Sequence, residues 1–226
     1  MEIGDIKTIE LTFVNAFLIK VNDGFILVDT GLSMQWEKLE RELIESGCLP
    51  DHLKLVLITH GDLDHTGNCL KLQEKYQSKI ALHKADNDLV EFGVRTRRKV
   101  RTFSAMIFVM IRRLMRSKLM KSKLVADKFK PDLFLTDGQR LDEYGFNAKI
   151  IHIPGHTKGS IGILTDDGKL LAGDIFTNRR KPDLATYIEN SKELGMSYAK
   201  LKTMNINTIY PGHGKPFEMD QIAHLL

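Results

Sequence analysis

The sequence predicts an α/β (α+β) fold, a four-layer αββα sandwich of two mixed β-sheets with outer helices. Three observations lead to this expectation. Each half of the chain opens with short β-prone segments, each continues with helices flanked by strands, and a basic segment at about 86–130 lies between the halves. A chain of 226 residues is one ordinary domain. We therefore expect a single domain over residues 1–226, with the basic segment as a helical insertion.

The first half contains a β-meander followed by a strand–helix–strand unit. Asn22-Asp23-Gly24 is a strong signal for a tight turn between two strands. Trp36, Leu39 and Leu43 recur at the spacing of one helical face, and Gly47 fits the position after a helix C-terminus. The predicted strands of this half are 6–13, 15–21, 25–28, 53–59 and 79–83, and the predicted helices are 35–46 and 67–77.

The second half repeats this organisation. Asp166-Asp167-Gly168 predicts a hairpin turn between two of its strands. The predicted strands are 139–141, 148–153, 160–164, 169–172 and 208–210, and the predicted helices are about 191–204 and from about 218 to the end. Because the order of elements matches the first half, we expect two similar sheets packed face to face.

Composition restricts the class of protein. With 42% hydrophobic and 27% charged residues, the chain is typical of a globular protein. Its longest purely apolar run, residues 105–111, is far shorter than the roughly 20 residues that cross a bilayer. The first residues contain no apolar segment of a secretory signal. We therefore expect a cytoplasmic protein. Cys48 and Cys69 do not form a CxxC or similar pair, and in a reducing compartment we expect both to be buried, unreactive thiols.

Metal-binding side chains are densest in His60-Gly61-Asp62-Leu63-Asp64-His65, directly after a predicted buried strand. A strand end and the loop after it project such side chains into one space. Imidazole and carboxylate are ligands for divalent zinc, iron or manganese. The sequence therefore predicts metal binding by His60, Asp62, Asp64 and His65.

Three further ligand candidates stand in matching contexts: His156, Asp174 and His213. His156 and His213 follow predicted strands through Pro-Gly turns, and Asp174 follows a strand and Gly173. Glycine allows a close backbone approach and a positive φ, so the next side chain can turn inward. We expect all three to join the His60 loop at one site.

The order and contexts of these residues resemble the metallo-β-lactamase superfamily, and the resemblance spans nearly the whole chain. It implies that His60, Asp62 and His156 hold one metal ion, while Asp64, His65 and His213 hold a second. Asp174 would bridge both ions, and Asp29, at the end of an early strand, would orient a ligand without binding metal. On this basis Asp64 and Asp174 are the residues expected to take part in catalysis.

The chain departs from the family pattern at Asp62, where the family usually has a second histidine. A carboxylate still ligates zinc. The aspartates at 62, 64 and 174 would neutralise three of the four charges of two divalent ions, which makes the site more suitable for iron or manganese. We expect two divalent ions, with zinc favoured and iron or manganese as alternatives.

The expected activity is that of a binuclear metallohydrolase, in which a metal-bridging hydroxide cleaves a small ester, lactone, thioester or phosphoester. The alternative, motivated by Asp62, is a di-iron oxidoreductase for oxygen or nitric oxide, similar to flavodiiron proteins and served by a separate electron donor. A binding module for nucleic acid or membrane, with structural metals, is a third hypothesis.

The basic segment concentrates the positive charge. Residues 95–130 carry a net +12, and since the whole chain carries +4, the rest carries −8. Three interpretations stay open: a capping helical pair, a wall that recognises an anionic or acyl-bearing substrate, and a basic amphipathic helix for a membrane surface or nucleic acid. We expect a small-molecule substrate and no nucleic-acid partner, and leave open peripheral membrane contact through 95–130 and a homodimer.

Overall fold

The computed structural model describes residues 1–94, 98–101 and 127–225. Its strands are β1 (Ile6–Leu11), β2 (Val14–Val21), β3 (Gly24–Val28), β4 (Leu53–Leu57), β5 (Lys79–His83), β6 (Lys99–Val100), β7 (Leu133–Leu135), β8 (Ala148–His152), β9 (Ile161–Thr165), β10 (Lys169–Gly173), β11 (Phe176–Thr177), β12 (Asp183–Leu184), β13 (Tyr187–Ile188), β14 (Thr208–Pro211) and β15 (Phe217–Glu218). Its helices are α1 (Trp36–Glu45), α2 (Leu63–Thr66), α3 (Cys69–Tyr76), α4 (Asn87–Glu91) and α7 (Ser191–Lys202).

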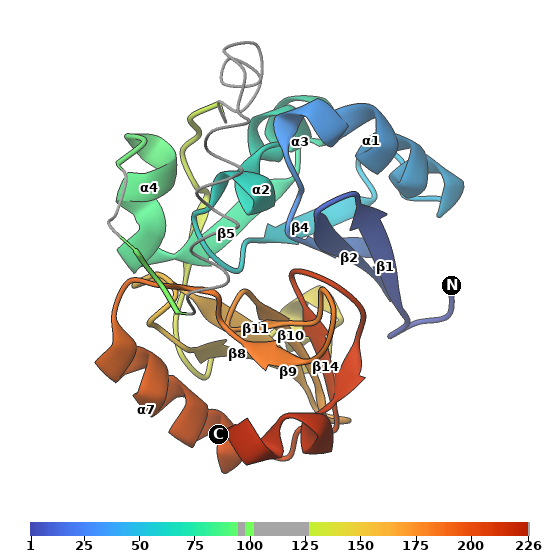
Figure 1. Cartoon of the computed structure of the whole chain (residues 1–226). Coiled ribbons are helices and arrows are strands. Elements are labelled where there is room, and N and C mark those ends of the chain that lie inside the picture. Colours follow the sequence, from blue (N-terminus) through green and yellow to red (C-terminus); the bar gives the residue numbers. More distant parts are fainter. Residues whose placement is uncertain (95–97, 102–126, 226) are drawn as a thin grey trace.

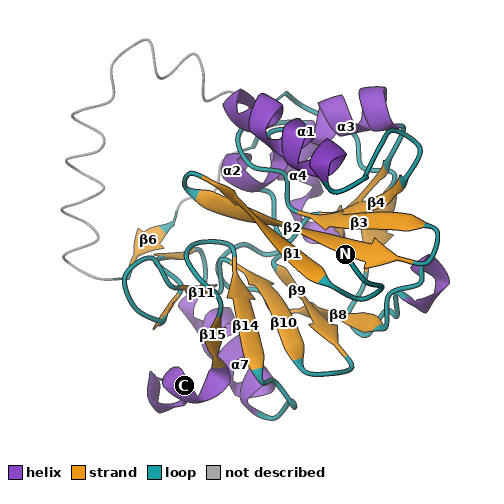
Figure 2. Cartoon of the chain, turned by 90° about the vertical axis from the view of Figure 1, so that its right-hand side faces the viewer, coloured by secondary structure: helices purple, strands orange, loops and turns teal. Residues whose placement is uncertain are grey.

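Two mixed β-sheets form the centre of the molecule, with helices on both outer faces (Figure 1). The six-stranded sheet has the order β1-β2-β3-β4-β5-β7, and the five-stranded sheet has the order β15-β14-β10-β9-β8. The pairs β11–β12 and β13–β6 make two small additional ribbons. The predicted αββα sandwich is confirmed. Figure 2 shows the two sheets from the side of β1 and β14. Helices α1 and α3 lie on the outer face of the six-stranded sheet, and α7 lies on the outer face of the five-stranded sheet.

Alternation along the strands divides the core into three apolar layers. In β2, Ala16 and Leu18 belong to the layer with Leu43 and Leu72, which come from α1 and α3. The intervening Phe17 contacts the layer between the two sheets, because successive side chains of a strand point to opposite faces. Leu194, Tyr198 and Leu201 of α7 complete the third layer on the outside of the five-stranded sheet.

Several predicted boundaries were wrong. Residues 139–141 form only an isolated bridge between Arg140 and Lys149, while the unpredicted β7 pairs in parallel with β5. The predicted helix 67–77 corresponds to α3, while the short helix α2, which precedes it, was not predicted. Instead of a final helix, Phe217 and Glu218 pair with β14, which leaves room only for short 3-10 turns at Met219–Gln221 and Ala223–Leu225.

The predicted insertion at about 86–130 is described only in part. Asp86 ends a 3-10 turn, α4 follows it, and Lys99–Val100 pairs with Tyr187–Ile188 of the second half. The helical part of the prediction lies mostly at 95–97 and 102–126, outside the described residues. None of the described helices combines the length and apolar composition needed to span a membrane.

Both cysteines are fully buried and free, as predicted. Burial raises the pKa of the Cys48 thiol to about 12. It also raises the pKa of the Cys69 thiol. Both side chains therefore act as small apolar groups in the layer beneath the helices.

Leu55→Ala should destabilise the fold strongly. Leu55 is fully buried in the layer between the sheets, so its truncation leaves a cavity as well as losing apolar burial. We expect the free energy of unfolding, measured by urea titration, to fall by about 2–5 kcal/mol. Leu49→Ala, at a position 47% exposed, is the matched control and should change it by less than about 0.5 kcal/mol. Similar losses in both variants would contradict this account of the core.

Candidate metal centre

The sequence-predicted ligands lie at one end of the sandwich, between the two sheets. The His60 loop follows β4, and His156, Asp174 and His213 follow β8, β10 and β14. The four histidines are almost fully buried, with 0–5% of their surface exposed. Parallel pairing of β10 with β14 carries Asp174 and His213 to the same edge of their sheet.

Two groups of three side chains have their ligand atoms within 4.8 Å of one another: His60, His156 and Asp174, and Asp64, His65 and His213. The structure thus brings together six of the seven predicted ligands in these groups. The two groups adjoin, since the ring centroids of His60 and His65 are 4.1 Å apart.

Asp174 contacts both groups. Its Oδ1 lies 3.4 Å from His65 Nε2, and its Oδ2 lies 3.2 Å from His213 Nε2 and 3.8 Å from His156 Nε2. Its carboxylate is therefore placed between the two groups, where one ion on each side can reach it.

Each histidine is held through Nδ1, which leaves Nε2 facing the centre. His156 Nδ1 donates to the carbonyl oxygen of Tyr187 at 2.8 Å, and His213 Nδ1 donates to that of Phe13. His60 Nδ1 lies 3.0 Å from the Thr59 hydroxyl. Because a carbonyl can only accept, Nε2 of His156 and of His213 is free of hydrogen in the neutral ring and can donate its lone pair to a metal.

Asp29 holds the fourth histidine. Its Oδ2 lies 2.8 Å from His65 Nδ1, and its two oxygens accept hydrogen bonds from the backbone and hydroxyl of Thr59. Asp29 adopts a φ of 59°, a left-handed conformation that aspartate tolerates better than most residues. This conformation turns the carboxylate at the end of β3 toward the His60 loop, in the geometry expected of a residue that orients a ligand.

Unpartnered buried atoms show that the pocket fits a metal. His60 Nε2, His65 Nε2 and Asp174 Oδ1 are buried and have no hydrogen-bond partner. A buried polar atom without a partner is costly, and a cation bound at these lone pairs would satisfy all three. The donor set of imidazole nitrogens and carboxylate oxygens suits zinc, iron and manganese.

Two carboxylates of the centre, those of Asp174 and Asp62, are held in their ionised form. Burial raises the pKa of Asp174, but His213 and His65 outweigh it and bring the pKa well below its usual value. Burial likewise raises the pKa of Asp62, which hydrogen bonds with His156 and His60 bring well below its usual value. Burial lowers the pKa of His60 and keeps that ring neutral. The ionised carboxylates and the neutral His60 ring are the charge states that metal binding needs, whereas the same carboxylates outweigh burial and raise the pKa of His65 and His156, so that a metal must displace protons there.

Asp62, the seventh predicted ligand, is paired with an arginine that sequence reasoning missed. Arg98 donates to both carboxylate oxygens of Asp62, from Nη2 to Oδ1 at 2.6 Å and from Nη1 to Oδ2. The same Nη1 lies 3.4 Å from His156 Nε2. Asp62 Oδ2 is also 3.4 Å from His60 Nε2 and 3.3 Å from His156 Nε2. Arg98 and an ion in the His60 group would therefore compete for one oxygen.

Asp86 is a second residue that the sequence analysis did not single out. This buried carboxylate accepts hydrogen bonds from the backbone of Gly61 at 2.8 Å and of Gly159 at 2.7 Å, and from the hydroxyl of Thr157 at 2.8 Å. It thus joins the His60 loop to the His156 loop. Its position three residues after β5, a strand-end context like that of the ligands, was the available signal.

Comparison with known proteins agrees with this geometry. Residues 9–213 match the sequence profile of the metallo-β-lactamase superfamily. The chain belongs to this superfamily. Among solved structures, a metallo-β-lactamase family protein from Thermus thermophilus superposes with a TM-score of 0.72 at 21% identity, covering 98% of this chain and 77% of the other. BJP-1, a subclass B3 metallo-β-lactamase of Bradyrhizobium japonicum, gives 0.67 at 22% identity, covering 94% and 76%.

Two curated relatives are hydrolases. The acyl-coenzyme A thioesterase MBLAC2 of Homo sapiens is 22% identical over 227 residues, which cover 93% of this chain and 76% of that protein. The hydroxyacylglutathione hydrolase GloC of Haemophilus influenzae is 31% identical over 126 residues, which cover 55% of this chain and 50% of that protein. Family and relatives support the prediction of a hydrolase.

Arg98→Ala should strengthen metal binding by the group that contains His60 and His156. The change removes a cation that repels an incoming ion and occupies Asp62. Zinc binding at the two groups gives two dissociation constants, measured by competition with a chromogenic chelator. We expect the larger of the two to decrease on the order of tenfold.

Arg101→Ala is the matched control for Arg98→Ala, because Arg101 pairs with Asp183 at 2.5 Å. It should leave both zinc dissociation constants unchanged. Weaker zinc binding by the Arg98 variant would show instead that the arginine supports the site by orienting Asp62.

Asp86→Ala should destabilise the protein and loosen the centre. Three buried donors lose their acceptor, so we expect the free energy of unfolding in urea to fall by about 3 kcal/mol. The exposed Asp88 provides the control, and Asp88→Ala should stay within about 0.5 kcal/mol of the wild type. An Asp86 variant as stable as that control would refute the role of Asp86 as a link between the two loops.

Proposed function

We propose that this chain is a metal-dependent hydrolase that holds two divalent ions and cleaves the thioester bond of a small acyl compound. The observation that carries the proposal is the position of Asp174 between the two ligand groups. One ion would be held by His60, His156 and Asp174, and the other by Asp64, His65 and His213, with Asp174 shared.

The choice of a thioester is supported by the relatives. One is named an acyl-coenzyme A thioesterase and another a hydroxyacylglutathione hydrolase. Coenzyme A and glutathione are both thiols. Among the esters, lactones, thioesters and phosphoesters open to such a centre, a thioester is therefore the substrate that we test first.

Bound ions would supply acidification of a water molecule and polarisation of the substrate carbonyl. The residues of the chain supply the rest. Asp64 and Asp174 would offset two of the four positive charges of two divalent ions, and Asp62, which Arg98 already pairs in this structure, would offset a third only after it separates from Arg98. The buried imidazoles, oriented through Nδ1, would hold the ions through Nε2.

Asp64 is suited to handle a proton. Its Oδ2 lies 3.5 Å from His213 Nε2, within the ligand group, which leaves Oδ1 to accept a proton from the attacking water. Its side chain is 34% exposed, against 12% for Asp174, so it lies on the side of the centre that solvent and substrate reach.

Metal-loaded protein should hydrolyse acyl thioesters, and His60→Ala or Asp174→Asn should reduce kcat/KM by about 100-fold or more, because each removes a ligand. Release of free thiol measures the reaction. His224→Ala and Asp23→Asn change the same residue types at exposed positions and should leave kcat/KM unchanged. Hydrolysis that is insensitive to both ligand substitutions would refute the proposal.

Metal analysis separates this proposal from the di-iron alternative. Protein purified without chelators should contain close to two equivalents of zinc and be colourless. Tightly bound iron with visible absorption that changes on reduction would support an oxidoreductase instead.

A further inference from the structure

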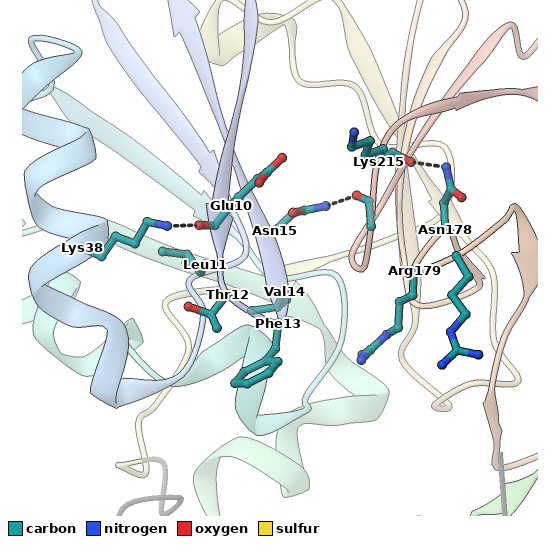
Figure 3. Close-up of a pocket in the computed structure, with 12 residues that line it drawn as sticks. Glu10, Leu11, Thr12, Phe13, Val14, Asn15, Lys38, Asn178, Arg179 and Lys215 are labelled. Carbon is teal, nitrogen blue, oxygen red and sulfur yellow. Dashed lines mark hydrogen bonds between the residues drawn. The ribbon is translucent and has the colours of Figure 1, made fainter. Parts of the chain in front are cut away.

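A cavity of about 770 Å³ lies beside the candidate metal centre. Figure 3 shows its two walls: Thr12 and Phe13 of the β1–β2 turn on one side, and Asn178, Arg179 and Lys215 on the other. We refer to this space, also lined by Lys38, Arg180 and Gly214, as the anion pocket.

The lining of the anion pocket is strongly cationic. Lys38, Arg179, Arg180 and Lys215 line it, against one acid, Glu10. Within the described ranges, neither arginine nor Lys215 has an acidic partner, and Lys38 Nζ donates only to the carbonyl oxygen of Glu10 at 2.5 Å. Unpaired guanidinium groups that converge on one cavity are a favourable arrangement for a phosphate.

Both walls of the anion pocket are bonded to the metal-ligand candidate His213. The carbonyl oxygen of Phe13 accepts from His213 Nδ1, and the backbone N–H of Asn178 donates to the carbonyl oxygen of His213 at 2.8 Å. A Cβ on Gly214, whose φ is 94°, would lie 1.9 Å from the Asn178 oxygen, so only glycine permits this approach of the two loops. Both walls of the pocket therefore adjoin His213 and, through it, the candidate metal centre.

The apolar content of the pocket argues against an acyl chain as its occupant. Leu11 and Val14 are buried in the core, and the large apolar side chain exposed there is Phe13, at 56%. A single exposed ring cannot cover a long alkyl chain, but it offers a face on which a heterocyclic base can stack.

We propose that the substrate is an acyl thioester of a nucleotide-bearing thiol. The anion pocket would bind its phosphate groups while its acyl carbonyl lies at the metal centre. This inference rests on the proposed thioester hydrolysis and adds the substrate class. Phosphate would lie against Arg179, Arg180 and Lys215, and the base against Phe13. The chain thereby prefers thioesters of phosphorylated carriers to those of uncharged thiols.

The decisive measurement is binding, because it does not require hydrolysis. Metal-loaded protein is titrated by calorimetry with desulfo-coenzyme A, which carries the phosphates but lacks a thiol that could ligate the ions. The Arg179→Ala/Arg180→Ala variant should bind about tenfold more weakly than the wild type. Raising the salt concentration should weaken wild-type binding, because the lining cations are exposed and screened.

Lys181→Ala is the matched control. Lys181 is the exposed neighbour of Arg180 but does not line the pocket, so its removal tests whether general positive charge is enough. It should bind desulfo-coenzyme A within about twofold of the wild type. An equal loss of affinity for desulfo-coenzyme A in Lys181→Ala and in the double arginine variant would overturn the assignment of the pocket.

Kinetics provide the second test. For an acyl-coenzyme A, the double variant should raise KM about tenfold with little change in kcat, and for the N-acetylcysteamine thioester of the same acid it should change neither. Absence of desulfo-coenzyme A binding by the wild type overturns the inference. A loss of activity in the double variant that is confined to acyl-glutathione also overturns the inference, because the charged groups of glutathione are carboxylates rather than phosphates. Tight, arginine-dependent binding without hydrolysis of any thioester would instead reject the proposed function and keep the pocket.

Discussion

The hydrogen bonds that fix Nδ1 of four buried histidines are the constraint on which the centre depends. Their partners come from four separate parts of the chain: Asp29 after β3, Thr59 after β4, the β1–β2 turn at Phe13, and β13 at Tyr187. Each bond fixes the orientation of its ring, and the carbonyl acceptors of His156 and His213 also select the tautomer, so that all four Nε2 atoms face one space. The sandwich matters to function mainly because it brings these partners to one end of its two sheets.

A centre of this kind is costly without cations. Several ionised carboxylates and unpartnered nitrogens lie in a buried space, and each would be unfavourable alone. Arg98 supplies one positive charge, to Asp62, and places the guanidinium where an ion of the His60 group would bind. The Asp64, His65 and His213 group has no such competitor among the described residues, so the two halves of the centre are chemically unequal.

The ligand candidates and the sandwich could be predicted from the sequence because both are local patterns: apolar strands, glycine turns and metal-binding side chains directly after them. The partners of Arg98 and Asp86 could not be predicted, because they lie 36 residues away at Asp62 and 71 residues away at Thr157, and the strand-end position of Asp86 indicates only that it could belong to the site. The strand β7 was missed because three residues show no periodicity, and the terminal helix was predicted wrongly because pairing of β15 with β14 overrides local preference.

The inequality of the two halves gives the site a direction. On the His60 side, Arg98 and Asp62 satisfy each other, and an anion approaching there meets a guanidinium already occupied by a carboxylate. On the His213 side, the backbone bonds to Phe13 and Asn178 lead into a cavity whose arginines have no acidic partner among the described residues. Under the proposed function, an anionic substrate would therefore be attracted from the His213 side and would reach Asp174 with its charged end still outside the centre. In that proposal Asp62, paired with Arg98, and the anion pocket would act on opposite ends of one substrate molecule.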